Sequence, residues 1–421
     1  MNTTFPLQQA NAFTPVFRKS LWCGTQVLTD TAHHISVYTT VHDLPPIWEQ
    51  FASETVWQRP FLHAIEQCPP QGVRPVYVII YEQREAIGIA YCQLLDFNAG
   101  ESISFAPIQA SDCLFTKVGK HFKYFVAQRI GFHGLVNGNL LLTGEYGYKF
   151  AKHVAPTRQI SLLEESIETA RTLLVERLAI DIKLTLFKEF FEPTIAHTDA
   201  FRKSACTEFK VEPNMVLDFA ENWETFDDYM AAMSSKYRVR TKRTFKKLDK
   251  LTCRDLEYIE LAQLETEMHD LYNAVLSSAQ FNLIELQPAY FTTLKKNLQA
   301  DFVVKGYFEG EKLVGFCTAI RNDTELEAHF LGLNEAYNHS HALYHNMLYE
   351  LIRIGFDWQV KRILFARTAH EIKSSVGAVP KEMYLYMRHS CKISNSLLKS
   401  LFVYLQPTPT DWQQRHPFKE E

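Results

Sequence analysis

The eight cysteines of this 421-residue chain are scattered, and no CxxC or other close pair occurs among them. That spacing excludes a zinc knuckle and offers no disulfide framework, which fits a reducing compartment. The N-terminal MNTTFPLQQANAFTP has no basic region followed by an apolar core, so it does not predict a signal peptide. No run approaches the roughly 18 apolar residues of a membrane span. We therefore expect a cytoplasmic protein without a transmembrane segment.

Familiar catalytic motifs and an excess of positive charge are also missing. The chain contains no GxSxG, no GxxxxGK[ST] and no GxGxxG. Its formal net charge of -4 excludes a molecule built to coat nucleic acid, so we expect no DNA partner. Any anion site must then be a local patch.

The length and composition predict two ordinary globular domains. A chain of 421 residues exceeds what one hydrophobic core usually serves. With 46% hydrophobic and 22% charged residues, the chain has no need of disorder.

An internal repeat defines the expected organisation. The strand–turn–strand pattern YEQREAIGIA (81–90) recurs as FEGEKLVGFC (308–317). RIGF occurs at 129–132 and at 353–356, and HHISVYTT (33–40) resembles DLEYIEL (255–261). Features repeated in one order at nearly constant offset predict two copies of a β-α-α-β-β-β-α-β unit, an α/β fold with mixed sheets.

We place the predicted boundaries as follows. Residues 1–32 are an irregular lead-in, 33–200 the first unit, and 201–421 the second unit with a basic helix at 234–250. Within these units we expect a loop at 98–116, helices over about 117–131 and over 159–178, and strands in NGNLLLTG (137–144), DIKLTLF (181–187) and VEPNMVLDF (211–219).

The stretch from Leu326 to Pro380 carries the densest chemistry. LEAHFLGL is typical of a strand, and from His341 the apolar residues follow helical spacing to Gly355, which we expect to end the helix. RILFA predicts a second buried strand. The polar segment ARTAHEIKSSVGA follows directly, at a strand end where ligands gather in α/β sheets.

The segment from Lys236 to Lys250 holds eight basic residues and one acidic residue. Met233, Tyr237, Thr244, Leu248 and Leu251 form a narrow apolar stripe on the helical projection. One interpretation is a solvated surface helix. The other is a positive face for a polyanion, favoured because no i,i+4 glutamates balance the charges. Its candidate contact residues are Arg238, Arg240, Lys242 and Arg243.

At this point the chain resembles the FemAB-like branch of the acyl-CoA N-acyltransferase (GNAT) superfamily, over about residues 33–390. The resemblance is sharpest in SSKYRVRTKRTFKK and in the strand–helix–strand that ends with Lys373 a few residues before Gly377. It implies tandem GNAT-like domains, with the second unit active and the first forming the acceptor side of a cleft.

The resemblance also implies transfer of an acyl or aminoacyl group to an amine, in a bacterial protein of cell-envelope precursor metabolism. Acyl-CoA is the expected donor cofactor, although NEAYNHSH stands where ordinary acetyltransferases have a glycine-rich pyrophosphate loop. Alternatives are a tRNA-dependent peptidoglycan-type aminoacyltransferase and a catalytically inactive metabolite-binding protein.

Amine acylation needs a base near neutral pH, hydrogen-bond donors for the developing oxyanion, and alignment of two substrates. His329, His345 and Glu371 are the candidate catalytic residues. Each also has a structural interpretation: a satisfied strand histidine, a helix-surface histidine, and an ion-pair partner of Arg367 or Lys373.

The candidate substrate-binding residues outside the basic helix are Tyr344, Arg367, Thr368 and Lys373. Arg367 and Lys373 are suited to phosphate or carboxylate. His341 and His345 have the i,i+4 spacing of a zinc helix, but the glutamate of HExxH is missing and no cysteine is close in sequence. We predict no metal site.

Overall fold

The computed structural model describes residues 23–28, 32–98, 131–195, 197–248, 250–277, 283–405 and 412–419. The expected loop at 98–116 and helix at 117–131 lie outside these residues, apart from their ends: Asn98 and Gly131 belong to strands.

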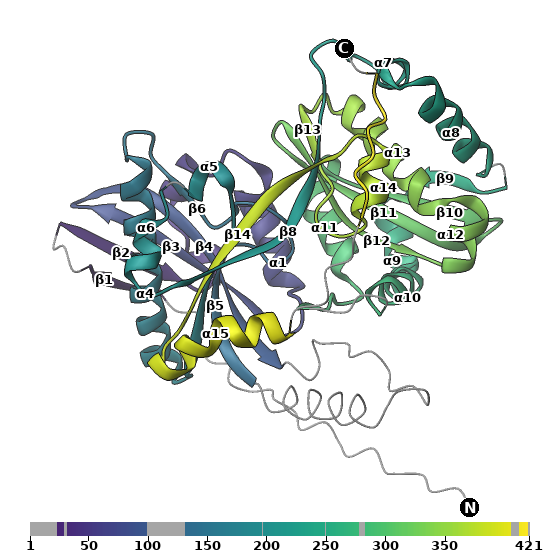
Figure 1. Cartoon of the computed structure of the whole chain (residues 1–421). Coiled ribbons are helices and arrows are strands. Elements are labelled where there is room, and N and C mark those ends of the chain that lie inside the picture. The colour runs from purple at the N-terminus through teal and green to yellow at the C-terminus, as the bar shows by residue number, and fades with distance from the viewer. Residues whose placement is uncertain are drawn as a thin grey trace, which may run out of the picture.

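One mixed sheet of 14 strands runs through the described part of the chain (Figure 1). Its order is β1-β2-β3-β4-β5-β7-β14-β8-β13-β12-β11-β10-β9, with β6 paired to β4. The neighbouring strands are antiparallel, except for the parallel pairs β5–β7 and β12–β13. The predicted α/β class with mixed sheets is therefore confirmed.

The strand bounds divide into three groups. The first half holds β1 (Cys23–Val27), β2 (His33–Tyr38), β3 (Val73–Glu82), β4 (Glu85–Asn98), β5 (Gly131–Asn137), β6 (Tyr148–Phe150) and β7 (Ile182–Phe191). The second half holds β9 (Thr252–Asp255), β10 (Phe302–Glu309), β11 (Lys312–Asn322), β12 (Glu325–Leu333) and β13 (Arg362–Leu364). Between them lie β8 (Thr207–Asp218) and β14 (Val379–His389).

The predicted tandem repeat is confirmed in the two hairpins. The register of β3–β4 shifts between Ile80 and Tyr81, and that of β10–β11 shifts between Tyr307 and Phe308. These irregularities fall at the same place in the two copies of the sequence pattern, since Tyr81 and Phe308 each open one copy. Each half then continues with a strand, a long helix and a parallel strand: β5, α4 (Pro156–Leu178), β7 and β12, α13 (Leu343–Asp357), β13.

Two of the sequence matches do not occupy equivalent positions. Gly131 and Phe132 open strand β5, whereas Gly355 and Phe356 lie inside helix α13. In DLEYIEL, Asp255 ends strand β9 and helix α9 (Tyr258–Gln263) follows. Peptides this short recur by chance, and neither match carries a constraint as specific as a shared bulge.

Three local predictions are corrected. Residues 138–144 are irregular rather than a strand, because Gly138 and Gly144 turn the chain with φ of +127° and +142°. Gly355 does not end its helix: it lets α13 pack closely, since an added Cβ would lie 2.9 Å from Phe219. The left-handed residue beyond that helix is Gln359. Part of the expected irregular lead-in is the edge strand β1, paired with β2.

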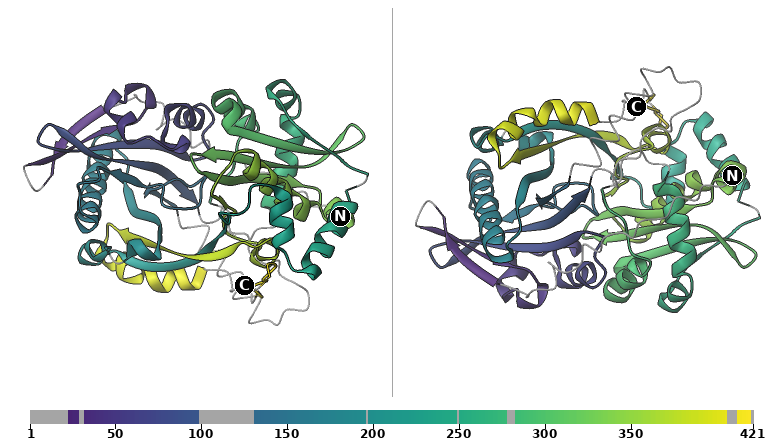
Figure 2. Two further views of the ribbon diagram at one scale, coloured as in Figure 1. Left: turned by 90° about the horizontal axis from the view of Figure 1, so that it is seen from above. Right: turned by 90° about the horizontal axis from the view of Figure 1, so that it is seen from below.

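The long strands β8 and β14 join the two halves (Figures 1 and 2). β8 pairs with β13 at its carboxyl end, while β14 pairs with β7 of the first half through Met383 to His389. Helix α15 (Lys392–Leu405) then packs beside β14, so the C-terminal part of the chain returns to the first half. The predicted division at residue 200 stays a prediction; the sheet itself is continuous across it.

Helices cover both halves and share one core. α1 (Arg59–Gln67) packs on α11 (Tyr290–Leu298), and their buried residues belong to a hydrophobic cluster that spans both halves. Second and third clusters lie under α4 and under α13. The remaining helices are α5 (Glu192–Ile195), α6 (Asp199–Lys203), α7 (Phe226–Ala232), α8 (Ser235–Lys246), α10 (Glu265–Leu276), α12 (Glu335–His341) and α14 (His370–Ser375), with short 3-10 turns η2 (Val41–Asp43), η3 (Pro46–Gln50), η4 (Thr55–Trp57) and η5 (Gln299–Asp301). None of the helices in the described ranges is long and apolar enough to cross a membrane.

Candidate functional site

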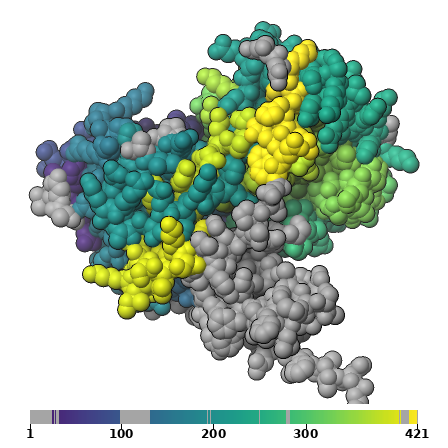
Figure 3. Space-filling model, in the orientation of Figure 1, coloured from purple at the N-terminus to yellow at the C-terminus, as the bar shows by residue number. Residues whose placement is uncertain are grey.

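Arg367 leads from the predicted polar segment to a buried group of ionisable side chains. Figure 3 shows yellow-green surface from the later part of the chain lying between teal segments of earlier residues. Its guanidinium lies 3.5 Å from Glu189 Oε1 of β7, in the other half of the molecule. Glu189 pairs in turn with Lys188, and Glu327 of β12 pairs with Tyr146. We call Tyr146, Lys188, Glu189, Glu327 and Arg367 the acid–base cluster.

A β-bulge explains how neighbouring residues of one strand both enter this cluster. Side chains of consecutive strand residues normally point to opposite faces. Opposite the bulge, β14 has one residue between Tyr384 and Tyr386, where β7 has Lys188 and Glu189. Glu189 has a left-handed backbone, with φ of +57°, and is 1% exposed. Such strain in a non-glycine residue costs roughly 1–2 kcal/mol and is concentrated at functional sites.

Burial brings the pKa values of two members of the cluster close to neutral pH. Desolvation raises the pKa of Glu327 to about 8, against the hydrogen bond from Tyr146. Desolvation also lowers the pKa of Lys188 to about 8, against the attraction of Glu189. Glu327 is 3% exposed and Lys188 is 6% exposed. Groups with pKa values near the working pH are suited to proton transfer.

The irregular loop between β5 and β6 wraps around the bulge. Lys188 Nζ donates to Leu142 O at 2.7 Å, and Gly144 N donates to Glu189 Oε2 at 2.8 Å. Gly138 is required there because an added Cβ would lie 2.8 Å from the Cβ of Lys188. The loop thus fixes both side chains of the bulge.

Two buried acceptor oxygens at this place have no hydrogen-bond donor among the described residues. They are Glu189 Oε1, which has the Arg367 guanidinium at the ion-pair distance of 3.5 Å, and Asn214 Oδ1. Asn214 is fully buried, and its Nδ2 donates to Thr143 O at 3.2 Å, next to the Gly144 amide that binds Glu189. A buried polar atom without a partner costs about 1–3 kcal/mol, so each such atom needs an explanation.

Lys373 holds the backbone of the loop that carries Arg367. Its buried ammonium donates to Ala366 O at 3.1 Å and to Arg367 O at 2.6 Å. The loop it holds contains left-handed residues at Ala366, Thr368 and Ala369, and the side chain of Thr368 is exposed. Desolvation lowers the pKa of Lys373 to about 7. Lys373 therefore lies where it shapes the loop that carries Arg367.

His329 lies at a second bulge. Between Ala328 and Leu331, two residues of β12 oppose Thr318 alone on β11. The backbone N–H and carbonyl of Phe330 are both bonded to the Thr318 hydroxyl, at 3.0 and 2.8 Å. His329 Nε2 is 2.8 Å from the Tyr290 hydroxyl, and desolvation lowers its pKa to about 3. The ring is therefore neutral at pH 7 and a weak base.

The other predicted residues each have separate partners. His345 Nε2 is 2.8 Å from the Ser375 hydroxyl, and desolvation, with Arg240 and Lys247, lowers its pKa to about 4. Glu371 pairs with Arg415, not with Arg367 or Lys373. Tyr344 is half-buried, and desolvation raises its pKa. The predicted side chains thus do not converge on one point, and their roles stay predictions.

At the amino end of α13, where a phosphate would be expected, one backbone N–H is already bonded within the chain. The segment NEAYNHSH consists of Asn334 and helix α12. Asn338 Oδ1 of that helix accepts a hydrogen bond from the backbone N–H of Tyr344 at 3.1 Å. Asn346 Nδ2 bonds three carbonyls, including that of Ala342 before the helix. In the first turn of α13, the N–H of Tyr344 is therefore already bonded to a side chain of α12.

The predicted basic helix is α8, which ends at Lys246 rather than at residue 250. Tyr237 and Thr244 of the expected stripe lie on this helix, whereas Met233, Leu248 and Leu251 lie outside it and pack in or on the third cluster. In the described chain no carboxylate pairs with Arg238, Arg240, Lys242 or Arg243. A search of the same residues finds no group of three or more metal-ligating side chains.

Sequence reasoning missed Tyr146, Lys188, Glu189, Asn214 and Glu327. One signal was present for Glu327, since LEAHFLGL places a carboxylate inside an otherwise apolar strand. The pair at 188–189 had no such signal, because a bulge is invisible in the pattern FKEFF.

Comparison with known proteins finds similar solved structures. No family model matches the chain, and no curated protein matches it. Similar solved structures include FemX (7% identity, 78% of this chain and 90% of that chain, TM-score 0.47). A tandem GNAT protein from the clavulanic acid biosynthesis pathway has 10% identity, covers 78% of this chain and 86% of that chain, and gives a TM-score of 0.46. L-PGS from Bacillus licheniformis has 10% identity, covers 80% of this chain and 95% of that chain, and gives 0.43. Of these, FemX and the tandem GNAT protein carry names of the kind that the sequence resemblance gave. The functional argument below rests on this chain's own residues.

Proposed function

We propose that the chain is a transferase that moves an activated acyl or aminoacyl group to an amine acceptor, in the metabolism of a cell-envelope precursor. The acceptor amine binds at the acid–base cluster. This assignment moves the proposed chemistry from His329, His345 and Glu371 to groups contributed by both halves of the molecule.

The observation that carries the proposal is a pair of buried acceptors that lack a hydrogen bond among the described residues; one of them, Glu189 Oε1, has only the Arg367 guanidinium at 3.5 Å. An ammonium group has three donors and no acceptor, so it suits Glu189 Oε1 and Asn214 Oδ1 together. The nearby carboxyl of Glu327 has a pKa of about 8. Arg367, with a side chain that is 39% exposed, is the member of the cluster that a substrate would contact from solvent.

The chemistry follows from these groups. Ionised Glu327 takes a proton from the bound ammonium, and the free amine attacks the carbonyl carbon of the activated group. A C–N bond forms, and the bond from carbon to the sulfur or oxygen of the carrier breaks. The carrier leaves with the bonding electrons and a proton. The guanidinium of Arg367 holds an anionic part of either substrate by paired hydrogen bonds.

The donor is either an acyl-CoA or an aminoacyl-tRNA. The backbone N–H of Tyr344 in the first turn of α13 is already bonded to Asn338, which is unfavourable for a phosphate-bearing thioester bound at that helix end. The unneutralised basic residues of α8 favour a larger polyanion. Aminoacyl-tRNA is therefore the alternative with a specific observation behind it.

An inactive binding protein is the second candidate function. It is supported by the close packing of the cluster, since Lys188, Glu189 and Glu327 are each at most 6% exposed. Such a protein would bind an amine without transferring anything to it.

The test separates binding from transfer. Thermal-shift screening with primary amines should stabilise the wild type, and Glu189→Gln should lose that stabilisation. Glu192→Gln, an exposed carboxylate just beyond the end of β7, is the matched control and should keep it. Equal stabilisation of all three proteins would contradict amine binding at the cluster.

Transfer is then measured by mass spectrometry of the amine after incubation with acyl-CoAs or aminoacyl-tRNAs. We expect acylated amine from one donor class, and a loss of about 100-fold in kcat for Glu327→Gln, typical of a removed general base. Amine binding without product from either donor class would favour the inactive binding protein.

A further inference from the structure

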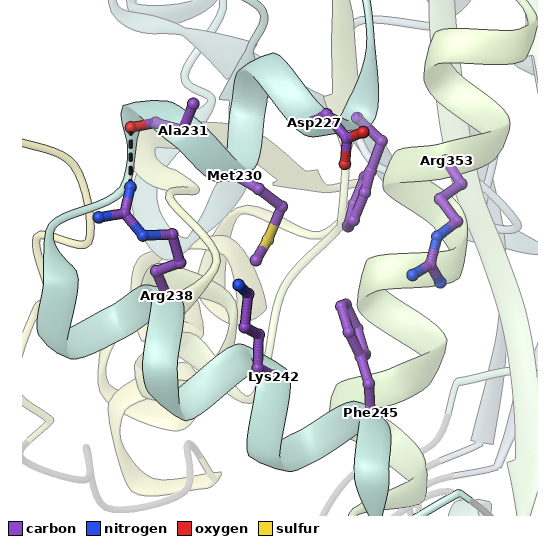
Figure 4. A pocket seen from close by; sticks show the side chains of 8 residues that line it. Asp227, Met230, Ala231, Arg238, Lys242, Phe245 and Arg353 are labelled. Atoms are coloured by element: carbon purple, nitrogen blue, oxygen red, sulfur yellow. Dashed lines mark hydrogen bonds between the residues drawn. The ribbon is translucent and has the colours of Figure 1, made fainter.

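A groove on the second half lies outside the acid–base cluster. It runs between α7, α8 and α13 and encloses about 550 Å³, within the size range of small-molecule sites. Phe226, Met230, Arg238, Lys242, Phe245 and Arg353 line it, as Figure 4 shows. It shares no residue with the cluster, but Arg238 and Lys242 are two of the four basic residues of α8 that favour a larger polyanion, so a ligand in the groove would occupy part of that surface.

The cations of the groove are not neutralised by the protein. Arg238 reaches the Ala231 carbonyl at 3.4 Å, and Lys242 has no carboxylate partner among the described residues. With Lys246 they form a row of like charges at i,i+4 spacing, which destabilises a helix. An external anion would relieve that repulsion.

The rest of the groove wall is mainly apolar, and its one cation, Arg353, already has partners within the protein. The Arg353 guanidinium lies 4.4 Å from the ring centroid of Phe226 and 4.7 Å from that of Phe245, and it donates to Glu350 at 3.2 Å. The stacked rings and Met230 leave an apolar surface beside the free charges of Arg238 and Lys242.

Asp227 makes the two ends of the groove electrostatically different. Figure 4 shows Asp227 at the Arg353 end, well away from Arg238. An anionic group is therefore attracted to the end formed by Arg238 and Lys242 and repelled from the other. The apolar part of the ligand must lie over Met230 and the rings.

We propose that this groove binds a small amphipathic anion, a single phosphate or carboxylate group joined to an apolar chain or ring. The head group pairs with Arg238 and Lys242, and the apolar part covers Met230, Phe226 and Phe245. Arg240 does not line the groove; its charge acts on His345. Helix α8 thus directs Arg238 and Lys242 to the groove, while the charge of Arg240 acts on His345.

The test uses octyl phosphate as the probe, with inorganic phosphate and octanol as its two halves. Isothermal titration calorimetry of the full chain should show one saturable site for octyl phosphate. Each half alone should bind at least tenfold more weakly, because either the charge pairing or the apolar contact is missing. Inorganic phosphate binding as tightly as octyl phosphate would overturn the amphipathic assignment.

Charge-reversal variants of α8 test whether octyl phosphate binds in the groove. Lys242→Glu should weaken octyl phosphate binding about tenfold, and Arg238→Glu similarly. Lys246→Glu makes the same change on the same helix outside the groove and should stay within about twofold. Lys242 and Lys246 are both exposed, and either change relieves repulsion within α8, so folding is preserved.

Two results would refute the proposal that the anion binds in the groove. One is an equal loss of affinity in the Lys242 and Lys246 variants, which marks diffuse attraction to the helix. The other is binding to phosphatidylglycerol vesicles with no binding of monomeric octyl phosphate, which marks a membrane-facing surface.

Discussion

Glu327 and Lys373 are buried side chains that titrate near neutral pH, in opposite senses. A pKa raised from 4.5 to about 8 means that native Glu327 keeps a proton that the unfolded chain has lost. Its contribution to the free energy of unfolding therefore falls as the pH rises from about 4.5 to 8. A pKa lowered from 10.5 to about 7 means that native Lys373 loses its proton first, so its contribution rises between about pH 7 and 10.5.

We predict that Glu327→Gln makes the free energy of unfolding fall less steeply between pH 5 and 8, by up to about 1.4 kcal/mol per pH unit. Lys373→Met should instead remove part of the rise above pH 7. Urea denaturation at a series of pH values measures both. Glu335→Gln, an exposed residue of α12, is the control and should keep the wild-type slope. An unchanged slope in Glu327→Gln would show that Glu327 ionises as in the unfolded chain.

The sequence pattern predicted Arg367 and Lys373 as substrate-binding residues, but it did not predict the partners that they have in the structure. Both were visible as charges beyond a predicted strand. Glu189 was not, because its burial depends on a bulge set by the register of β14, which lies near the other end of the chain. Lys373, expected to bind an anion, is occupied with two backbone carbonyls.

At the scale of elements, the bulge in β12 depends on one hydroxyl. Thr318 is 1% exposed and bonds both backbone polar groups of Phe330. Thr318→Val keeps the side-chain shape but leaves that N–H and that carbonyl without their partner.

We predict that Thr318→Val loses about 2–3 kcal/mol of unfolding free energy. Thr318→Ser keeps the hydroxyl and should lose clearly less. Chemical denaturation of the two variants beside the wild type measures the difference. Equal stability of the Val and Ser variants would mean that the bulge is held by its packing alone.

Elements with strong periodicity were predictable, and those set by irregular backbone were not. Helix α4 and strands β7 and β8 occur where the pattern placed them. The segment NGNLLLTG has the composition of a strand, yet Gly138 and Gly144 turn it into the loop that holds Lys188 and Glu189. Apolar residues there are buried as a loop against the bulge, which periodicity does not distinguish from a strand.

At the scale of the whole molecule, the last strand ties the two halves together. Arg388 of β14 bonds Glu164 and Glu168 of α4, at 2.7 and 2.6 Å. The Tyr386 hydroxyl is 2.7 Å from that of Thr198. The first half is therefore incomplete without residues near the end of the chain.

We predict that fragments 1–205 and 206–421 aggregate when expressed singly and form a soluble complex when expressed together. The cut falls in the exposed turn at Ala205, so it removes no strand. Size-exclusion chromatography and urea unfolding measure the outcome. A monodisperse 1–205 fragment with cooperative unfolding would show that β7 does not need β14.

The return of β14 has a consequence for synthesis on the ribosome. β7 ends at Phe191 and β14 begins only at Val379, so nearly the whole second half is made before the two strands can pair. At typical rates of translation, the nascent first half waits on the order of 10–40 s with an unpaired strand edge. An open edge over that time is a site for pairing with other nascent chains. Slowing translation of the second half should therefore lower the yield of this protein, although it leaves the folded molecule unchanged.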